Sequence, residues 1–572
     1  MKFLAKYLKP FGRRMLLGFS TKVVATLIEL LLPLILTHIL NNVIAERNMW
    51  LIVGYGVIML LCAATACITN IVANRMAAKV SMQFSRRMRR DLFHKTLLLT
   101  ARDTDRLTVP SLESRITTDT YNIHSFVGMM QRMGVRAPIL LIGGMAISFM
   151  LDAALALVML AMLPFIFGVV YFISRKGVPL YRKVQESVDR MVRVVREDTQ
   201  GIRVIKALSK GEYENKKFAK VNEGLSSDEK TAGTTMGAVN PIMTLFMNLG
   251  ICAVVLISAY RISGGESAAA TVIAFIQYFT LISMAMMSLS RIFVMYTKCA
   301  ASAARIEEVM NITESLEVIE NAEKRDTGAM IELREVDFSY FGVRNNLDKI
   351  SISVGPGERL GIIGATGSGK TTLVRLLLRF YEPDSGDIFI DGRRLDSYSR
   401  EELCGIMGVA QQGDFLYSDT IYENIDMGRG LHREDIEWAA RVAQADGFIT
   451  EGEGGYERVL TPHGSNLSGG QRQRLTIARA VAARPKILIL DDSSSALDYK
   501  TDAQLRRAIA EELKDTTVIT VAQRVSSVKD AELIIVLDEG VIIGAGTHEQ
   551  LLLSCPEYKE ISDSQMGGAI IE

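Results

Sequence analysis

"RLGIIGATGSGKTTLVRLLLRF", residues 359–380, joins an apolar strand to a helix through a glycine-rich turn. Within it, Gly364 to Thr371 fits the pattern G-x-x-x-x-G-K-[ST] in the strand, turn and helix context that the pattern needs. Glycines let the backbone N–H groups of such a turn point at phosphate oxygens, a conformation that side chains would block. We expect Lys370 to reach the β- and γ-phosphates of a nucleotide and Thr371 to offer its hydroxyl to Mg²⁺. The residues expected to hold the nucleotide here are Gly364, Ala365, Thr366, Gly367, Ser368, Gly369, Lys370, Thr371 and Thr372.

A second stretch, "ILILDDSSSALD" at residues 487–498, places two aspartates directly after an apolar strand. Taken alone, it would indicate only a core strand that ends at the surface. In the same domain as a phosphate-binding turn, Asp491 is instead expected to hold the water shell of Mg²⁺. The two stretches together predict a site for a nucleotide and its metal ion.

A third stretch, "NLSGGQRQRLTIARA" at residues 466–480, leads small residues directly into a helix. The free N–H groups and the positive end of the helix dipole make such a helix start a place where an anion can bind. Because the glycine-rich turn already holds the phosphates within this domain, we expect the helix start to serve a nucleotide bound to another molecule. The stretch therefore predicts a partner chain.

Around these motifs, from about Ile331 onward, strands alternate with helices, which is typical of a largely parallel sheet covered on its faces. The composition changes after Arg305, and the polar stretch "NITESLEVIENAEKRDTG" precedes the first of these strands. A chain of 572 residues is too long for a single hydrophobic core. We expect a membrane domain at residues 1–310, a linker at 311–330 and an α/β domain at 331–572.

The first 300 residues contain recurring apolar segments of membrane-spanning length. We expect six spans, with a tight hairpin between the third and fourth: Leu16 to Leu40, Met49 to Ala73, Arg136 to Leu151, Ala153 to Ile173, Gly237 to Tyr260 and Ala268 to Met295. Lys and Arg gather between the second and third spans and between the fourth and fifth. This bias places those two connections, both termini and the α/β domain in the cytoplasm. Apolar residues recur there at helical spacing, so we expect long helices that leave the lipid bilayer and turn at "TVPSLESRI" and "ALSKGEYEN".

The overall charge is nearly balanced, because 65 Lys and Arg offset 64 Asp and Glu. With no basic tail or arginine-rich stripe, nucleic acid is not an expected partner. The six cysteines are scattered without a C-x-x-C pair, which suggests neither a disulfide framework nor a metal site.

A few polar residues lie within the expected spans. Lys22 and Glu29 are seven residues apart and therefore on one helical face. They could face a wet cavity, or form a buried ion pair with an arginine such as Arg132, Arg136 or Arg291. The methionines of the sixth span suit a surface that accepts many ligand shapes, although ordinary core packing gives the same pattern. The candidate residues for a substrate cavity are Glu29, Gln277, Tyr278, Met284 and Met287.

With these motifs in this order, and with "GIRVIKAL" at residues 201–208, the chain resembles a half-transporter of the ATP-binding cassette (ABC) exporter family over essentially its whole length. The resemblance implies a multi-domain protein, in which an all-α six-helix transmembrane bundle precedes an α/β P-loop domain. It implies that Tyr340 in "VDFSY" stacks on adenine. It also implies that ATP and Mg²⁺ are the cofactors, with Thr371, Gln411 and Asp491 around the metal.

The resemblance further assigns the loops that would meet a partner. The signature loop that acts on the partner's nucleotide would comprise Leu467, Ser468, Gly469, Gly470 and Gln471, and the loop that crosses between cassettes would contain Ser495 and Asp498. The tips near Leu112 and Lys210 would be the coupling helices, which contact the cassettes.

Two positions depart from the family pattern, which has Glu after the strand Asp and His in the later switch loop. This chain has Asp492 and, in "VITVAQRVSS", Gln523. The shorter Asp withdraws its carboxylate by about 1.5 Å, and a misplacement of about 1 Å can lower a rate by roughly 10²-fold. Gln can form hydrogen bonds but cannot carry a proton charge as His does. We therefore expect this site to bind MgATP and to cleave it slowly.

A homodimer would then contain two impaired sites, whereas pairing with a different half-transporter would leave one competent site, completed by this chain's signature loop. This asymmetry resembles that of bacterial heterodimeric multidrug exporters. We therefore expect ATP-driven export of small amphipathic compounds across the cytoplasmic membrane. Two alternatives stay open: export of a lipid or peptide, and a regulatory or sensory subunit that binds nucleotide without transport.

Overall fold

The computed structural model describes residues 2–263, 269–312, 318–319, 328–340, 342–413, 415–493 and 495–566. The chain divides into two compact units, one holding Met1–Leu97 and Thr108–Ile312 and the other holding Leu98–Leu107 and Thr313–Glu572. The sequence assigns residues 98–107 to the membrane domain, whereas the structure groups these ten residues with the C-terminal unit. Most of the expected linker at 311–330, and the expected start of the sixth span at Ala268, lie outside the described residues.

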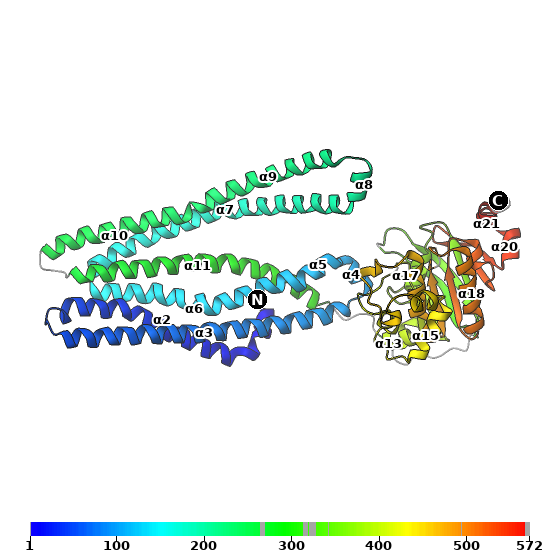
Figure 1. Cartoon of the computed structure of the whole chain (residues 1–572), viewed down its shortest axis with the longest axis horizontal. Coiled ribbons are helices and arrows are strands. Elements are labelled where there is room, and N and C mark those ends of the chain that lie inside the picture. The colour runs from blue at the N-terminus through cyan, green and yellow to red at the C-terminus, as the bar shows by residue number, and fades with distance from the viewer. Residues whose placement is uncertain are drawn as a thin grey trace. The chain divides into compact units, whose positions relative to one another are not determined.

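The N-terminal unit is built of helices, most of them long (Figure 1). They are α1 (Lys2–Leu8), α2 (Gly12–His38), α3 (Met49–Leu97), α5 (Val109–Ser114), α6 (Thr120–Leu151), α7 (Ala153–Gln200), α8 (Ile202–Ala207), α9 (Gly211–Gly237), α10 (Val239–Ser263) and α11 (Ala269–Met310). A 3-10 turn η1 (Lys9–Phe11) and two π-helical turns, η2 (Ile39–Val43) and η3 (Arg115–Asp119), adjoin them. Helix α2 packs beside α3, α6 beside α11, and α7 beside α9 and α10.

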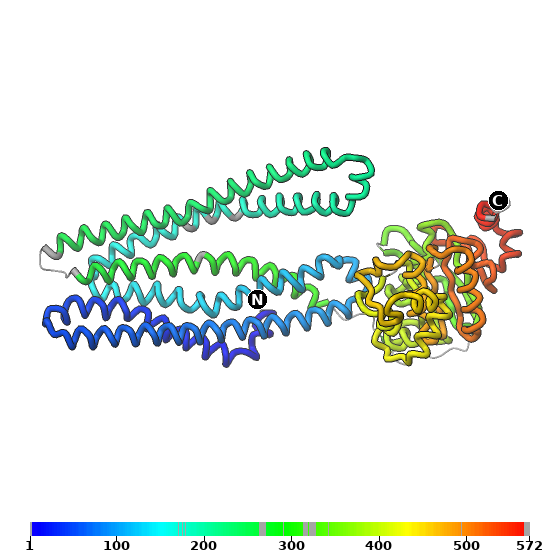
Figure 2. Tube along the Cα trace, in the orientation of Figure 1, coloured from blue at the N-terminus to red at the C-terminus, as the bar shows by residue number. Residues whose placement is uncertain are grey.

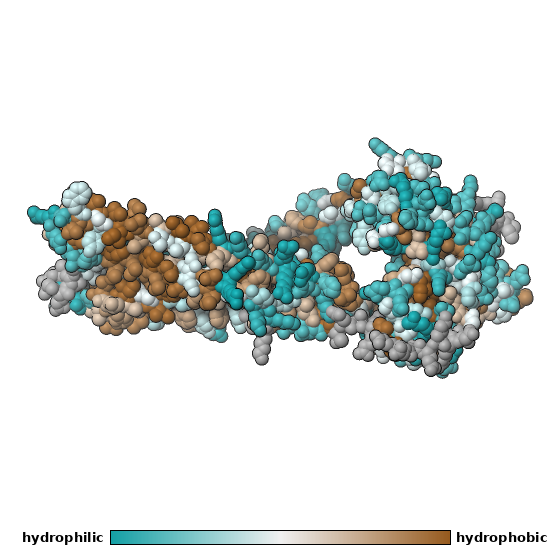
Figure 3. Space-filling model, turned by 90° about the horizontal axis from the view of Figure 1, so that it is seen from below, coloured by the Kyte–Doolittle hydropathy of each residue, from teal (hydrophilic) through white to brown (hydrophobic). Residues whose placement is uncertain are grey.

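Six helical segments among the described residues are long and apolar enough to cross a membrane. They are Phe3–Val43, Met49–Leu97, Val109–Leu151, Ala153–Gln200, Gly211–Arg261 and Ala270–Met310. Five of the expected spans fall inside these segments and the sixth overlaps the last, so the six-helix membrane bundle is confirmed. On the face shown in Figure 3, apolar side chains gather at one end of the helices, while hydrophilic residues become frequent along their extensions.

The connection between α6 and α7 is a single residue, Asp152. Asp152 ends α6 and caps α7, because its Oδ1 accepts hydrogen bonds from the backbone N–H groups of Ala154 at 3.0 Å and Leu155 at 3.3 Å. At the other end of α7, Figure 2 shows the trace turning through α8 into α9. This tip helix ends at Ala207, where the tip expected from the sequence begins.

The first tip lies earlier in the chain than "TVPSLESRI". Helix α3 ends at Leu97, the short helix α4 (Ala101–Leu107) forms the tip, and Thr108, with φ of 63°, turns the chain into α5. Leu112 is buried in the returning helix, so the expectation of a tip near it is wrong. The polar stretch forms a helix instead of a turn, and Pro110 lies in its first turn, where a proline fits the start of a helix.

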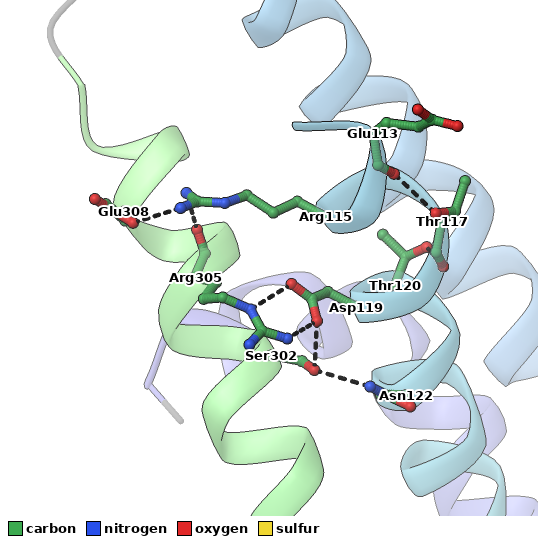
Figure 4. A network of polar contacts seen from close by, with 9 residues as sticks. All are labelled: Glu113, Arg115, Thr117, Asp119, Thr120, Asn122, Ser302, Arg305 and Glu308. Carbon is green, nitrogen blue, oxygen red and sulfur yellow. Dashed lines mark hydrogen bonds and ion pairs between the residues drawn. The ribbon is translucent and has the colours of Figure 1, made fainter. Parts of the chain in front are cut away.

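A completely buried carboxylate links the start of α6 to the end of α11 (Figure 4). Asp119 accepts hydrogen bonds from Arg305 Nε and Ser302 Oγ, each at 2.8 Å, and from a second guanidinium nitrogen of Arg305. Arg115 adds a hydrogen bond to the backbone carbonyl of Arg305 at 2.8 Å and an ion pair with Glu308 at 2.9 Å. We call Asp119, Ser302 and Arg305 the Asp119 anchor.

Two sheets form the C-terminal unit. The first has the order β2-β1-β4-β5 and is antiparallel, with β1 (Ile331–Phe338), β2 (Leu347–Val354), β4 (Ser385–Ile390) and β5 (Arg393–Arg394). The second has the order β10-β9-β3-β8-β7-β6, with β3 (Arg359–Gly364), β6 (Met407–Ala410), β7 (Ile487–Asp491), β8 (Thr517–Val521), β9 (Leu533–Asp538) and β10 (Val541–Gly546). It is parallel except for the antiparallel pair of β9 and β10. The expected α/β domain is confirmed.

Helices cover this second sheet and connect its strands, as the parallel strands require. They are α12 (Lys370–Leu377), α13 (Arg400–Ile406), α14 (Ile421–Asp426), α15 (Arg433–Val442), α16 (Asp446–Thr450), α17 (Gly469–Val481), α18 (Tyr499–Glu512), α19 (Val525–Val528), α20 (His548–Ser554) and α21 (Pro556–Met566). Strands β3, β8 and β7 are neighbours, so their carboxyl ends share one edge of the sheet. The topology therefore gathers the residues that follow these three strands.

Candidate nucleotide site

The glycine-rich turn follows β3 and leads into α12, which begins at Lys370. Gly367 and Gly369 adopt φ of 88° and 105°, in the left-handed region that favours glycine. At Gly364 a Cβ would lie 2.1 Å from the backbone oxygen of Leu537, so no side chain fits. The glycines of the motif are therefore required by the backbone itself, as well as by the phosphates that it is expected to hold.

Lys370 lies inside this turn. Its Nζ donates to the backbone oxygens of Gly364 at 2.9 Å and Ala365 at 2.7 Å. Burial lowers the pKa of the ammonium, while the nearby carboxylates of Asp492 and Asp491 oppose the shift. The third partner of Nζ is the Ser368 hydroxyl at 3.4 Å. A buried cation held by neutral oxygens is well suited to exchange them for the charged oxygens of a phosphate.

Asp491 ends β7 and is 3% exposed. Its Oδ1 is buried without a hydrogen-bond partner. Burial raises the pKa of this carboxyl group, and the charge of Asp492 raises it further, while the Thr371 hydroxyl and Lys370 oppose the shift. A carboxylate oxygen without a partner, close to a threonine hydroxyl, offers the oxygen ligands that Mg²⁺ prefers. The residues present fit a magnesium ion.

Asp492 is held differently. Its φ is 48°, which is uncommon for a residue other than glycine, and its backbone N–H donates to Val521 at 2.9 Å. Its Oδ2 lies 3.3 Å from the amide nitrogen of Gln412 and 3.4 Å from that of Gln523. Burial raises the pKa of Asp492, and the contact from Gln412 opposes this. The structure thus brings together the two positions that depart from the family pattern.

Gln412, and not the neighbouring Gln411, contacts Asp492. Both side chains are exposed, but of the two only the amide of Gln412 reaches this carboxylate among the hydrogen bonds of the described residues, so we take Gln412 in place of Gln411 as the candidate link to the metal. Two consecutive glutamines follow β6, which ends at Ala410, so the motif alone leaves the choice open by one position. Only the path of the chain after the strand decides which side chain points to the site.

Tyr340, the expected adenine platform, connects the turn to the first tip helix. Its hydroxyl donates to Thr372 at 3.4 Å and accepts from Arg375 at 3.2 Å. Its ring packs edge-on against Tyr381, with centroids 5.1 Å apart. Tyr381 in turn donates a hydrogen bond to Asp105 of α4, and burial, followed by that carboxylate, raises the pKa of Tyr381. Within the C-terminal unit, the side chains of Asp105 and Tyr381 therefore link helix α4 to Tyr340.

The signature loop begins α17 with a capping box. Ser468 Oγ accepts from the N–H of Gln471 at 3.3 Å, and Gln471 Oε1 accepts from the N–H of Ser468 at 2.9 Å. Leu467 is buried beneath the loop, while Ser468 is exposed. Within the described residues, no hydrogen bond joins Ser468–Gln471 to Gly364–Thr371. The structure therefore does not bring these two predicted motifs together.

The signature helix is instead bonded to the expected inter-cassette loop. Gln473 donates to Ser495 Oγ at 3.1 Å and accepts from the backbone N–H of Ala496 at 2.9 Å. Ser495 also donates to the backbone oxygen of Asp492 at 3.0 Å, and Asp498 caps α18. Sequence analysis missed Gln473, because its role depends on a loop 22 residues away.

Comparisons with known proteins identify the same two parts in the same order. Residues 15–286 match the family model of the ABC transporter transmembrane region, and residues 347–495 match that of the ABC transporter. An uncharacterized ABC transporter ATP-binding protein of Mycobacterium tuberculosis is 33% identical, over 100% of this chain and 99% of that protein. The chain is an ABC half-transporter.

Further relatives of this half-transporter agree with that assignment. An uncharacterized ABC transporter ATP-binding protein of Bacillus subtilis is 34% identical over 98% of each chain. The ATP-dependent lipid A-core flippase of Pseudomonas fluorescens is 32% identical, over 90% of this chain and 86% of the flippase. The solved structure of a bacterial Atm1-family ABC exporter with ATP bound matches with a TM-score of 0.79 at 22% identity, over 98% of each chain. This last likeness shows the exporter fold.

Among the cavity candidates of the half-transporter, Glu29 forms an ion pair with Arg136, with Glu29 Oε2 3.1 Å from Arg136 Nε. Lys22 is buried and donates to Asn70 of α3 at 2.6 Å. Of the two interpretations left open by the sequence, the ion pair with Arg136 is present for Glu29. Lys22 is held instead by two amide oxygens, those of Asn70 and Asn74.

The candidates on α11 face different surroundings. Tyr278 is completely buried, and its hydroxyl donates to the backbone oxygen of Leu30 at 2.7 Å, so it joins α11 to α2. Gln277 and Met287 are half-buried, and Met284 is exposed. Of the four candidates on α11, these last three present accessible surface, as the half-buried Glu29 of α2 also does.

Proposed function

We propose that this half-transporter pairs with a different half-transporter and exports small amphipathic compounds across the cytoplasmic membrane, driven by ATP. Its own nucleotide site binds MgATP and cleaves it slowly, and its signature loop completes the competent site of the partner. The proposal keeps the domains at residues 1–310 and 331–572 and places both termini and the ATP-binding domain in the cytoplasm.

The observation that carries the proposal is the environment of Asp492. A carboxylate that activates water needs an oxygen free to accept a proton and aligned with the γ-phosphate. Here the oxygen Oδ2 lies within reach of two amide groups, from Gln412 and Gln523, and the side chain is one methylene shorter than Glu. Neutral amides also cannot take or give a proton as a histidine would. These features support slow cleavage.

Binding does not depend on Asp492. Tyr340 would stack on the base, Lys370 would exchange its carbonyl partners for phosphate oxygens, and Asp491 with Thr371 would hold the metal ion. When bound, Mg²⁺ neutralises charge on the phosphates. The parts that hold a nucleotide are therefore intact, while the parts that cleave it are altered.

The exposed signature loop supports the second half of the proposal. Ser468 is exposed, and among the described residues its side chain is hydrogen-bonded only within the capping box with Gln471, so the start of α17 suits the phosphates of a nucleotide held by the partner. We assign α4 and α8 as the coupling helices, because α4 packs on the cassette through Tyr381. ATP would draw the cassettes together, and this closure would turn the spans outward.

A lipid is the second candidate cargo. The specific observation that favours it is the 32% identity to a protein named as a lipid A-core flippase. Reconstituted into liposomes with its partner, the chain would then move a fluorescent lipid between leaflets. Accumulation of an amphipathic dye in inverted vesicles, without lipid movement, would favour the small-compound cargo.

The deciding experiment compares the chain purified alone with the chain purified with a second half-transporter that has Glu and His at the two altered positions. The chain alone is expected to bind MgATP and to cleave it slowly, and Lys370→Ala is expected to abolish binding. The pair is expected to cleave ATP rapidly, and Ser468→Ala in this chain is expected to slow the pair without weakening MgATP binding to this chain. Rapid ATP cleavage and transport by the chain alone would refute the proposal.

A further inference from the structure

The last described helix, α21, reaches back to the loop that carries Gln523. Gln565, near the end of this helix, accepts a hydrogen bond through Oε1 from the backbone N–H of Val525 at 2.8 Å. Its Nε2 donates to the backbone oxygen of Gln523, also at 2.8 Å. One side-chain amide therefore holds the backbone on both sides of Arg524.

The same loop is held at its other end by the sheet. It follows β8, which ends at Val521, and the N–H of Ala522 donates to the backbone oxygen of Ile362 at 3.0 Å. Gln523 thus lies between a strand and the amide of Gln565. Because its side chain lies 3.4 Å from Asp492, the backbone position of Gln523 decides how its amide meets that carboxylate.

Helix α21 is itself firmly attached, so Gln565 can serve as a fixed support. Tyr558 is completely buried, and its hydroxyl pairs with His548 Nδ1 at 2.7 Å. Ile561 packs against the apolar cluster that contains Val525 and Val528 of α19. The helix and the loop share one apolar core, and Gln565 adds the polar contacts at its edge.

We propose that Gln565 is a positioning residue of the nucleotide site: its side-chain amide sets the backbone of Gln523 and so the contact between Gln523 and Asp492. The C-terminal helix thereby becomes a support of the site, and displacing it would loosen the switch loop. This inference rests on the proposed function only in that the site binds MgATP.

The first test measures hydrogen exchange in the full-length chain without nucleotide, by mass spectrometry of the peptide that contains Gln523 to Val525. Gln565→Ala is expected to speed exchange of the Val525 amide roughly three- to tenfold, which corresponds to the net free energy of one lost hydrogen bond. Gln565→Glu keeps the acceptor for Val525 but loses the donor to Gln523, so a smaller increase is expected. Ser564→Ala, one residue earlier on the same helix, is the matched control and is expected to change nothing. Unchanged exchange in Gln565→Ala would overturn the proposal.

The second test separates positioning from general loss of structure. In single-turnover cleavage of bound ATP by the full chain, Gln565→Ala is expected to alter the cleavage rate by roughly three- to tenfold while MgATP affinity stays within about twofold. An equal loss of affinity and rate, or the same effect in Ser564→Ala, would overturn the positioning role. If even the unmodified chain binds no MgATP, the proposed function fails, and the exchange experiment still decides whether Gln565 holds the loop.

Discussion

Asp119 of the N-terminal unit and Asp491 of the C-terminal unit are both almost completely buried, at 0% and 3% exposure, yet their surroundings are opposite. Both oxygens of Asp119 accept hydrogen bonds, and Arg305 neutralises its charge. Asp491 has a buried oxygen with no partner, and its pKa is raised.

The difference separates an acid that serves structure from one that serves binding. A buried charge is costly unless it is paired, so a carboxylate kept without a partner must be retained for something that arrives later. The paired acid should therefore contribute to stability and leave nucleotide binding unchanged, whereas the unpaired acid should do the reverse.

The largest effect is expected at the Asp119 anchor. Arg305→Ala would leave a buried carboxylate without its cation and should destabilise the N-terminal unit by about 3–5 kcal/mol. Asp119→Asn should destabilise the unit clearly less, because the guanidinium group of Arg305 is half exposed and stays solvated. Thermal unfolding in detergent would measure both, and the double variant should recover most of the loss. Equal costs for the two single variants would contradict a dominant role for the buried charge.

The next effect concerns the altered acidic pair. Replacing Asp492 with Glu and Gln523 with His together should raise ATP cleavage by this chain by about 10²-fold, because the carboxylate regains the missing ~1.5 Å of reach. Single-turnover cleavage with the purified chain would measure the change, with Lys370→Ala added as the control that removes binding. No increase would show that the site is slow for reasons other than these two side chains.

A smaller effect is expected from Asp491→Asn. The folded pKa of Asp491 is raised, so the folded state binds more protons than the unfolded state, and stability falls as the pH rises from about 3.8 through the folded pKa. The variant should remove this loss and stabilise the nucleotide-free chain at neutral pH by about 1.4 kcal/mol for each unit by which the pKa is raised. It should also abolish the extra stabilisation that Mg²⁺ adds to ATP. Unfolding midpoints between pH 4.5 and 8, measured without ligand and with ATP in the presence and absence of Mg²⁺, would test both expectations. A destabilised variant would show that Asp491, like Asp119, serves structure.

The smallest effect distinguishes the two neighbouring glutamines. Gln412→Ala removes an amide donor from Asp492 and should weaken MgATP binding or alter its cleavage several-fold, as the loss of one hydrogen bond allows. Gln411→Ala is the matched control, because Gln411 is equally exposed but only Gln412 of the two contacts Asp492, and it should leave both quantities unchanged. The reverse result would restore Gln411 as the link to the metal.

Some features of the site were predictable because they are local. The glycine-rich turn, the apolar strand before Asp491 and the helix start after Ser468 each depend on residues a few positions apart. The six spans were predictable for the same reason, since length and hydropathy suffice. The tip at α4 was missed because the polar stretch expected to turn forms the helix α5 instead. The choice between Gln411 and Gln412 failed by a single residue at the end of a strand.

By itself, the amino-acid sequence determined the six-span bundle, the α/β domain and the candidate residues for a nucleotide, because these follow from periodicity and from motifs within short segments. Only the tertiary structure decided which side chains surround the carboxylates. Gln412 lies 80 residues from Asp492, Gln565 lies 42 from Gln523, and Arg305 lies 186 from Asp119. Contacts over such separations depend on how strands and helices are packed side by side, and no local pattern in the chain encodes that.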